Sequence, residues 1–311
     1  MRPNETTKRV LVTGASGFIG YHCLAPLVER GYEVHALQSR TAPLEHDGVR
    51  WHAADLFDLE STRLVIEEVR PTHLLHLAWY VVPGKVINHL DNAAWVQRTL
   101  DLLRLFQASG GKRLAICGSC YEYDWRYGCC SEALTPTQPD TFYGVCKNSL
   151  HQMVRWYCKL TGVSSAWGRV FFLYGPREHP DRLVSSVIRN LLANRPAPCS
   201  HGEQIRDYMS VLDVADGMAA LLDSDFEGPC NIACGQPTAI KSIVSRIGEL
   251  MGKPDLIKLG AIPPRTNDAP MVVADVTTMT QQLGWKPRLS LDEGLRATIG
   301  WWGGSLRQPL P

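Results

Sequence analysis

The chain has 311 residues, enough for one large domain or two modest ones, and its 45% apolar and 20% charged residues are ordinary for a folded globular protein. A formal net charge of +1 gives no reason to expect nucleic acid or an anionic membrane as a partner. No apolar run approaches the roughly 18 residues that a membrane-spanning helix needs, and residues 1–8 lack the apolar centre of a signal peptide. We therefore expect a cytoplasmic protein.

The ten cysteines are scattered along the chain. Without an export signal, reduced thiols are a better interpretation than a disulfide framework. Cys117 and Cys120 form a C-x-x-C pattern, but Cys117 ends an apolar, strand-like run, whereas a redox motif should open a helix. We expect neither redox chemistry nor a metal site.

A glycine-rich turn near the N-terminus is the first functional signal. The apolar segment 10–12 predicts a strand, and apolar residues at helical spacing follow the turn at 13–20. Gly14 permits a sharp turn, Gly17 lets a pyrophosphate approach the backbone, and Gly20 lets the helix pack closely on the strand. Since a helix N-terminus attracts anions, this strand–turn–helix unit predicts a dinucleotide site.

The turn sequence TGASGFIG, with its G-x-x-G-x-x-G spacing, resembles the extended branch of the short-chain dehydrogenase/reductase superfamily, which acts mostly on nucleotide sugars. The resemblance spans nearly the whole chain, because the segment starting R-D-Y at 206–208 and the L-G-W-K-P at 283–287 also resemble the family. The resemblance implies an enzyme that uses NAD or NADP.

Strand and helix patterns alternate up to about residue 175 and then loosen. This predicts an α/β fold: a Rossmann-like, doubly wound parallel sheet with a smaller C-terminal α/β substrate domain. We expect residues 1–175 to form the dinucleotide-binding domain, to which the chain returns near 207–232, and residues 176–311 to form mainly the nucleotide-sugar domain.

The predicted second strand ends in Gln38-Ser39-Arg40. An acidic residue here usually binds the ribose of NAD, whereas a cation suits a 2′-phosphate, so Ser39 and Arg40 favour NADP(H) over NAD(H). The resemblance implies that Asp55 and Leu56 flank the adenine and that residues 77–79 lie along the cofactor. The predicted cofactor-binding residues are Gly14, Ser16, Gly17, Phe18, Ile19, Gly20, Ser39, Arg40, Asp55, Leu56, Leu77, Ala78, Trp79, Tyr143 and Lys147.

Tyr143 and Lys147 stand four residues apart in a helical pattern, so they project from one face. An unperturbed tyrosine has a pKa near 10, and lowering it by about 3 units requires roughly 4 kcal/mol. A buried Lys147 ammonium, together with the positive ring of an oxidised nicotinamide, is expected to supply that. Ser119 ends a strand-like run whose carboxyl end should share a crevice with the glycine turn.

We therefore predict a catalytic triad of Ser119, Tyr143 and Lys147. Tyr143 would exchange a proton with a sugar oxygen while hydride moves between carbon and nicotinamide. Ser119 would hydrogen-bond the same oxygen, and Lys147 would bind the nicotinamide ribose.

Substrate residues are predicted chiefly from the resemblance. Arg206 is the main candidate for a diphosphate clamp, because a guanidinium offers paired donors to phosphate oxygens. The predicted substrate-binding residues are Ser119, Cys120, Tyr121, Arg177, Arg182, Arg206 and Arg265.

The resemblance also narrows the reaction. Dehydratases of the family carry Thr-Asp-Glu at positions 119–121, and Cys120 and Tyr121 cannot supply that acid and base. The favoured interpretation is an NADPH-dependent reductase of a nucleotide-linked 4-keto-6-deoxysugar. The alternative is an NAD-dependent nucleotide-sugar 4-epimerase, and a remote alternative is a non-catalytic, dinucleotide-sensing regulator.

The stretch 86–109 carries apolar residues on more than one side of its helical pattern. One side should face the sheet. The other favours a homodimer through a helical bundle, as in some relatives, or coverage by another part of the same chain.

Overall fold

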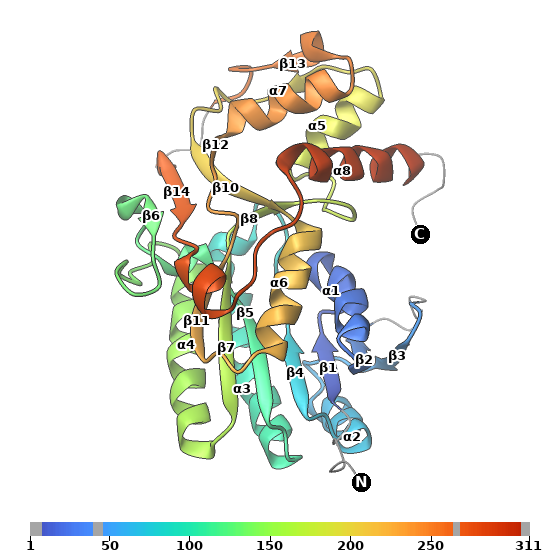
Figure 1. The fold of residues 1–311 in the computed structure, drawn as a ribbon, viewed down its shortest axis with the longest axis vertical. Coiled ribbons are helices and arrows are strands. Elements are labelled where there is room, and N and C mark those ends of the chain that lie inside the picture. Colours follow the sequence, from blue (N-terminus) through green and yellow to red (C-terminus); the bar gives the residue numbers. More distant parts are fainter. Residues whose placement is uncertain (1–7, 40–45, 264–267, 306–311) are drawn as a thin grey trace.

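A seven-stranded sheet with the strand order β11-β7-β5-β4-β1-β2-β3 forms the centre of the computed structural model, which describes residues 8–39, 46–263 and 268–305 (Figure 1). All neighbouring strands in it are parallel. The strands are β1 (Arg9–Thr13), β2 (Glu33–Gln38), β3 (Val49–Ala53), β4 (His73–His76), β5 (Arg113–Ser119), β7 (Ser164–Val170) and β11 (Gly228–Ile232). The order reverses between β1 and β4, and open α/β sheets bind their ligands at the carboxyl ends of the strands beside such a point. The predicted Rossmann-like fold is confirmed.

Helices cover both faces of this sheet, as the alternating side chains of β1 require. Val10 and Val12 pack in one apolar cluster with the first group of helices, and Leu11 packs in a second cluster with the other group. The first group is α1 (Phe18–Glu29) and α6 (Val211–Asp223); the second is α2 (Leu59–Val69), α3 (Asp91–Ala108) and α4 (Phe142–Thr161). Burial on both faces explains why the central strands read as continuous apolar runs.

The ends of α4 follow from its sequence. The Thr141 side chain accepts a hydrogen bond from the Gly144 backbone N–H at the start of the helix, and Gly162 ends it in the left-handed conformation with φ +75°. This capping fixes the first turn of α4, which carries Tyr143.

A second group of elements lies beyond the carboxyl ends of the parallel strands (Figure 1). Its main sheet has the order β12-β10-β14-β6, with β8 paired to β10 and a separate two-stranded pair formed by β9 and β13. The strands are β6 (Cys129–Cys130), β8 (Phe172–Tyr174), β9 (Ala197–Pro198), β10 (Ile205–Ser210), β12 (Pro237–Ala239), β13 (Ile257–Lys258) and β14 (Met271–Ala274). Helices α5 (Leu183–Leu192), α7 (Ile240–Leu250) and α8 (Leu291–Ser305) share a third apolar cluster.

Two long-range pairings connect these parts of the chain. Strand β6 reaches across to pair with β14, and β11 returns to the edge of the parallel sheet beside β7. Five short helical turns complete the described structure: η1 (Val86–Asn88), η2 (Cys120–Glu122), η3 (Trp125–Tyr127), η4 (Pro254–Leu256) and the π-helical η5 (Thr278–Gln282).

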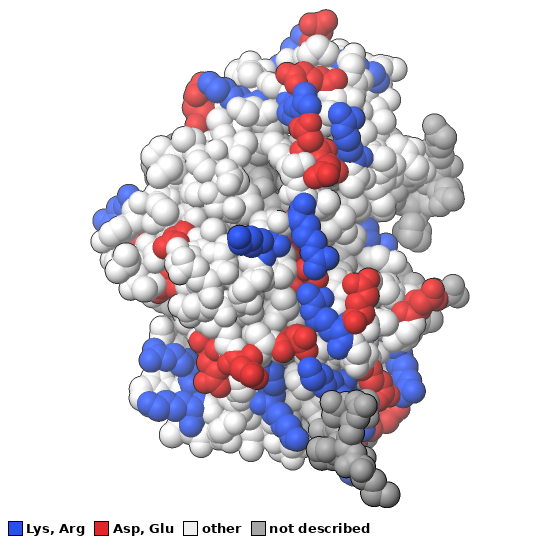
Figure 2. Space-filling view, viewed as in Figure 1, with Lys and Arg blue, Asp and Glu red and all other residues white. Residues whose placement is uncertain are grey.

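The surface charges, the cysteines and possible membrane or metal-binding features were each compared with the expectations from the sequence. Figure 2 shows positive and negative side chains interspersed on the face in view, without a large patch of either sign. All ten cysteines are free. Within the described ranges, no helix is long and apolar enough to span a bilayer, and no group of three or more metal-ligating side chains is present.

Candidate active site

The glycine turn between β1 and α1 is packed too tightly for side chains. Gly14 has φ +70°, and a Cβ atom there would lie 2.7 Å from the backbone nitrogen of Ala78. A Cβ atom on Gly20 would lie 2.1 Å from the carbonyl oxygen of Gly14. Gly17 caps α1 without any side-chain hydrogen bond, which leaves the first N–H groups of the helix without a side-chain cap. This cradle fits the pyrophosphate of a dinucleotide.

The predicted adenosine contacts surround the ends of β2 and β3. Ser39 and Asp55 are exposed, and the Asp55 carboxylate already accepts from the backbone N–H of Phe57 at 2.9 Å. Leu56 is buried. Arg40 lies outside the described residues, so the preference for NADP stays a prediction. Of the other predicted contacts, Ser16 is exposed, and Phe18, Ile19, Leu77 and Ala78 are half-buried around the turn.

The Trp79 ring packs against Tyr143 and Lys147 of α4, and we call it the Trp79 floor. Its indole N–H donates to the Oδ1 atom of Asn92 at 2.8 Å, and the amide of Asn92 donates to the Val86 carbonyl at 2.7 Å. The ammonium of Lys147 lies 3.8 Å from the centre of the Trp79 ring. Sequence reasoning missed Asn92, because its role depends on Trp79 lying opposite α3.

His76 beside this floor is a structural residue. Its two ring nitrogens contact the hydroxyls of Thr13 at 2.7 Å and Thr99 at 2.9 Å, and burial lowers its pKa to about 3. Both nitrogens are therefore engaged with the core and not with the crevice.

The structure brings the three predicted catalytic residues together. Ser119 ends β5, and its side chain hydrogen-bonds the Tyr143 hydroxyl from the first turn of α4. One turn later, the Lys147 ammonium donates to the carbonyl of Cys117 at 2.7 Å. All three are at the carboxyl edge of the parallel sheet, beside the glycine turn.

The pKa values of this triad differ from the sequence prediction. Burial is the largest influence on Tyr143 and raises its pKa above the ordinary value, with the nearby Cys117 acting in the same direction, while the Ser119 hydrogen bond lowers it. Burial also lowers the pKa of Lys147 to about 8. The lysine ammonium is directed to a backbone carbonyl and an indole ring, so the protein groups alone hold Tyr143 as the neutral phenol.

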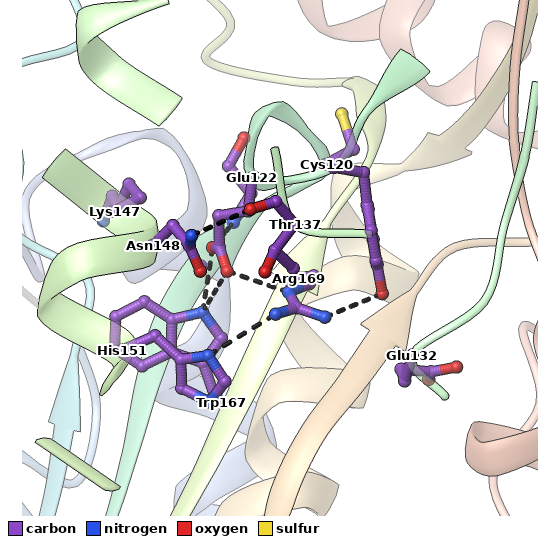
Figure 3. A network of polar contacts seen from close by, with 12 residues as sticks. Cys120, Glu122, Glu132, Thr137, Lys147, Asn148, His151, Trp167 and Arg169 are labelled. Atoms are coloured by element: carbon purple, nitrogen blue, oxygen red, sulfur yellow. Dashed lines mark hydrogen bonds and ion pairs between the residues drawn. The ribbon is translucent and has the colours of Figure 1, made fainter. Parts of the chain in front are cut away.

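A buried ion pair supports the turn that begins at Ser119 (Figure 3). The Glu122 carboxylate accepts from the Ser119 backbone N–H at 2.8 Å and from the Trp167 indole N–H at 2.8 Å. It also accepts from Arg169 Nε at 2.8 Å, and the two side chains are 0% and 2% exposed. The Arg169 guanidinium extends on to His151, whose Nδ1 is 3.4 Å away. Sequence reasoning missed this network.

The predicted substrate residues are arranged less simply. Cys120 is buried, and burial raises the pKa of its thiol well above the ordinary value. Arg206 is 2% exposed and donates to the Ile205 carbonyl at 2.8 Å and to Asp268 at 2.5 Å. The Arg177 guanidinium carbon lies 3.9 Å from the centre of the Tyr21 ring.

The remaining substrate predictions have less structural detail. Tyr121 is half-buried, Arg182 is exposed at the start of α5, and Arg265 lies outside the described residues. A role for any of these residues in substrate binding stays a prediction.

A family model described as "NAD dependent epimerase/dehydratase family" matches residues 10–234. The chain belongs to this family. The UDP-glucuronate 4-epimerase of Thermodesulfobacterium geofontis is 26% identical over 94% of this chain and 95% of that protein. UDP-glucuronic acid decarboxylase 1 of Xenopus tropicalis is 27% identical over 94% of this chain and 71% of that protein.

Solved structures give the same family. MoeE5 in complex with UDP-glucuronic acid and NAD is 29% identical, with a TM-score of 0.81 over 96% of this chain and 99% of that chain. The UDP-glucose 4-epimerase of Thermus thermophilus in complex with NAD is 25% identical, with a TM-score of 0.80 over 97% of this chain and 100% of that chain.

The predicted membership of the extended short-chain dehydrogenase/reductase family is therefore confirmed. The protein is an enzyme of the nucleotide-sugar oxidoreductase/epimerase type, which leaves the non-catalytic regulator without support. The two reported relatives that are named as 4-epimerases favour the predicted alternative, a 4-epimerase, over the keto-sugar reductase. The named solved relatives hold NAD, and none of these findings supports a preference for NADP.

Proposed function

We propose that the protein is an NAD-dependent nucleotide-sugar 4-epimerase. The observation that carries this proposal is the convergence of the buried Ser119 and Lys147 with the half-buried Tyr143 beside the glycine turn. Cys120, which follows the serine, is a buried thiol with a raised pKa, so it is unsuited to act as the acid of a dehydration. A site limited to proton and hydride exchange at one carbon fits epimerisation and keto-sugar reduction equally, and the relatives named as 4-epimerases favour epimerisation.

The residues that would hold NAD are those of the cradle and the Trp79 floor, with Lys147 at the ribose of the nicotinamide. NAD supplies, when bound, hydride acceptance and return, and its oxidised ring adds positive charge. Tyr143 would hold and move the proton of the sugar O4. Ser119 would orient that oxygen, and its hydrogen bond lowers the pKa of Tyr143.

The substrate in this proposal is a nucleotide-diphosphate sugar. Residues 1–175 would hold mainly the dinucleotide, and residues 176–311 mainly the sugar nucleotide. Arg177 and Arg182 would help to bind the diphosphate. Arg206 is already paired with Asp268, so it could bind the diphosphate only by keeping that carboxylate as a second partner or by breaking the pair.

A homodimer through α3 and α4 is also part of this proposal. Four apolar side chains at helical spacing on α4 are solvent-exposed: Val145 (43%), Met153 (41%), Trp156 (56%) and Leu160 (81%). A solvent-exposed apolar stripe of this kind on one helix suits a second copy of the same helix. Sedimentation of wild type, Trp156→Glu and the exposed control Leu259→Glu tests the proposed dimer. We expect wild type and the control to sediment as dimers and Trp156→Glu as a monomer, and a monomeric wild type would contradict the proposal.

The functional test begins with the cofactor. Purified protein is denatured and the released dinucleotide identified, and the native protein is then incubated with UDP-hexoses without added cofactor. Retained NAD and C4 inversion are expected. Release of NADP, with NADPH-dependent reduction of a 4-keto-6-deoxysugar and no C4 inversion, would instead establish the reductase. Ser39 and Arg40, after the second strand, favour that interpretation.

A further inference from the structure

The predicted catalytic lysine is buried against an indole ring. Lys147 is 3% exposed, and its ammonium lies 3.8 Å from the centre of the Trp79 ring. The same ammonium donates to the Cys117 carbonyl at 2.7 Å. The ring face and the carbonyl oxygen therefore both stabilise a cation that solvent barely reaches.

The titratable neighbours of Lys147 do not offset its burial. Burial is the largest influence and lowers the pKa of Lys147 to about 8, although Cys117 in β5 and Glu122 in η2 act in the opposite direction. The Glu122 carboxylate is already engaged in its own buried ion pair. Burial keeps His76 in β4 neutral, with a pKa of about 3, and Tyr143 on the preceding turn of α4 is a neutral phenol whose pKa burial raises. The ammonium therefore depends on contacts other than ion pairs.

The Trp79 ring is held in place by partners other than the lysine. Its indole N–H donates to the Oδ1 atom of Asn92 at 2.8 Å, and Asn92 is 0% exposed. The Asn92 amide in turn donates to the carbonyls of Val86 at 2.7 Å and His89 at 2.8 Å. On another side the Trp95 ring lies near Trp79, with ring centres 6.2 Å apart. These contacts fix the edge of the indole, so its face stays against the lysine.

The type of ring and its burial both favour a strong contact. Tryptophan has the most favourable face for a cation among the aromatic side chains, and the attraction grows when water is excluded. Trp79 is 9% exposed, so both partners are desolvated. A contact of this kind raises the pKa of a lysine by about one unit. Its effect is opposite to that of burial.

We propose that Trp79 is a positioning residue for the reaction, whose indole face holds Lys147 in the ammonium form beside Tyr143. The charge matters because an ammonium next to a phenol favours loss of the phenolic proton, whereas a neutral amine does not. The inference rests on the proposed function only for the roles of Lys147 and Tyr143, and it applies equally to an epimerase and a reductase.

The protonation of Lys147 is measured directly by NMR titration of protein that carries isotope-labelled lysine, with Lys147→Met assigning the signal. We expect Trp79→Met to lower the pKa of Lys147 by about one unit, and Trp79→Phe, which keeps a ring face, to lower it less. Trp95→Met removes the neighbouring ring and is the packing control, so it should leave the pKa unchanged. An unchanged pKa in Trp79→Met, or an equal shift in Trp95→Met, overturns the inference.

A change that preserves shape covers the case in which Trp79→Met does not fold. Protein produced with fluorinated tryptophan keeps the indole shape but has a less negative ring face, so the pKa of Lys147 should fall below that of unmodified protein. No fall overturns the inference.

Turnover is scored separately from the titration. The alkaline limb of kcat should move to lower pH in Trp79→Met by about the shift in the pKa of Lys147, which lost packing alone would not produce. An unmoved limb removes Trp79 from the reaction. Absence of C4 inversion by wild type contradicts the proposed function, whereas the NMR titration tests the contact between Trp79 and Lys147 in either case.

Discussion

Replacing Arg169 with leucine leaves the Glu122 carboxylate buried without its cation, and we expect the free energy of unfolding to fall by about 3–5 kcal/mol. The two side chains are 2% and 0% exposed, so solvent cannot replace the lost charge. The magnitude is large against a total stability of about 5–15 kcal/mol for a typical protein. Glu122→Gln keeps the shape but leaves Arg169 as the unpaired charge, and it should lose a similar amount.

The double variant Glu122→Gln/Arg169→Leu, which combines these two single changes, distinguishes a charge effect from simple loss of packing. If the cost comes from an uncompensated charge, the double variant should be more stable than the sum of the two single losses predicts, by at least about 1 kcal/mol. Urea unfolding followed by circular dichroism measures all four proteins. Lys241→Leu, which removes one partner of an exposed ion pair with Glu203, is the control and should change little. Additive losses, or a change in Arg169→Leu as small as in the control, would refute the reasoning.

Three further changes test the cradle, the triad and the core. Gly20→Ala should abolish dinucleotide binding, because its Cβ atom would lie 2.1 Å from the Gly14 carbonyl oxygen, whereas Gly17→Ala, at 3.1 Å, should weaken binding less; titration with NAD measures both. Tyr143→Phe should retain NAD and lower kcat by about 100–10,000-fold, and a near-normal rate would remove Tyr143 from the mechanism. His76 has its pKa lowered from 6.5 to about 3, so below pH 6.5 the unfolded chain binds a proton that the folded chain does not, and the free energy of unfolding falls as the pH decreases. His76→Gln should remove that contribution, which is about 1.4 kcal/mol per pH unit between pH 6.5 and 3. Urea unfolding of wild type and His76→Gln at pH 7 and pH 5 measures it, and an equal fall in the free energy of unfolding for both proteins would contradict the prediction.

Local sequence patterns predicted the features that depend on local geometry. The glycine spacing at 13–20 requires close backbone contacts, and the structure contains them. The four-residue spacing of Tyr143 and Lys147 requires only a helix, which Thr141 and Gly162 delimit. The family comparison confirmed the membership that these motifs indicated.

Features built from distant residues could not be predicted in this way. Glu122 and Arg169 are 47 residues apart, and their pairing exists only because η2 and β7 lie side by side. Trp125 and Phe172 likewise come from separate elements, η3 and β8, and their ring contact has no pattern in the sequence. Arg206 looks like a free phosphate ligand in the sequence, but in the fold it meets Asp268.

The pKa of Tyr143 illustrates the same limit. Sequence spacing indicated a nearby ammonium but contained no information about the cost of burial. In the fold, burial outweighs every favourable contact, and Lys147 donates to the Cys117 carbonyl.

The central claim, that this site inverts C4 of a nucleotide sugar by removing and returning one hydride, is tested most directly with substrate deuterated at C4. The protein is incubated with C4-deuterated UDP-6-deoxyglucose or UDP-glucose without added cofactor, and the product is examined by NMR. We predict the C4 epimer with deuterium retained at C4. Absence of the epimer, or an epimer that carries hydrogen at C4, would contradict the claim.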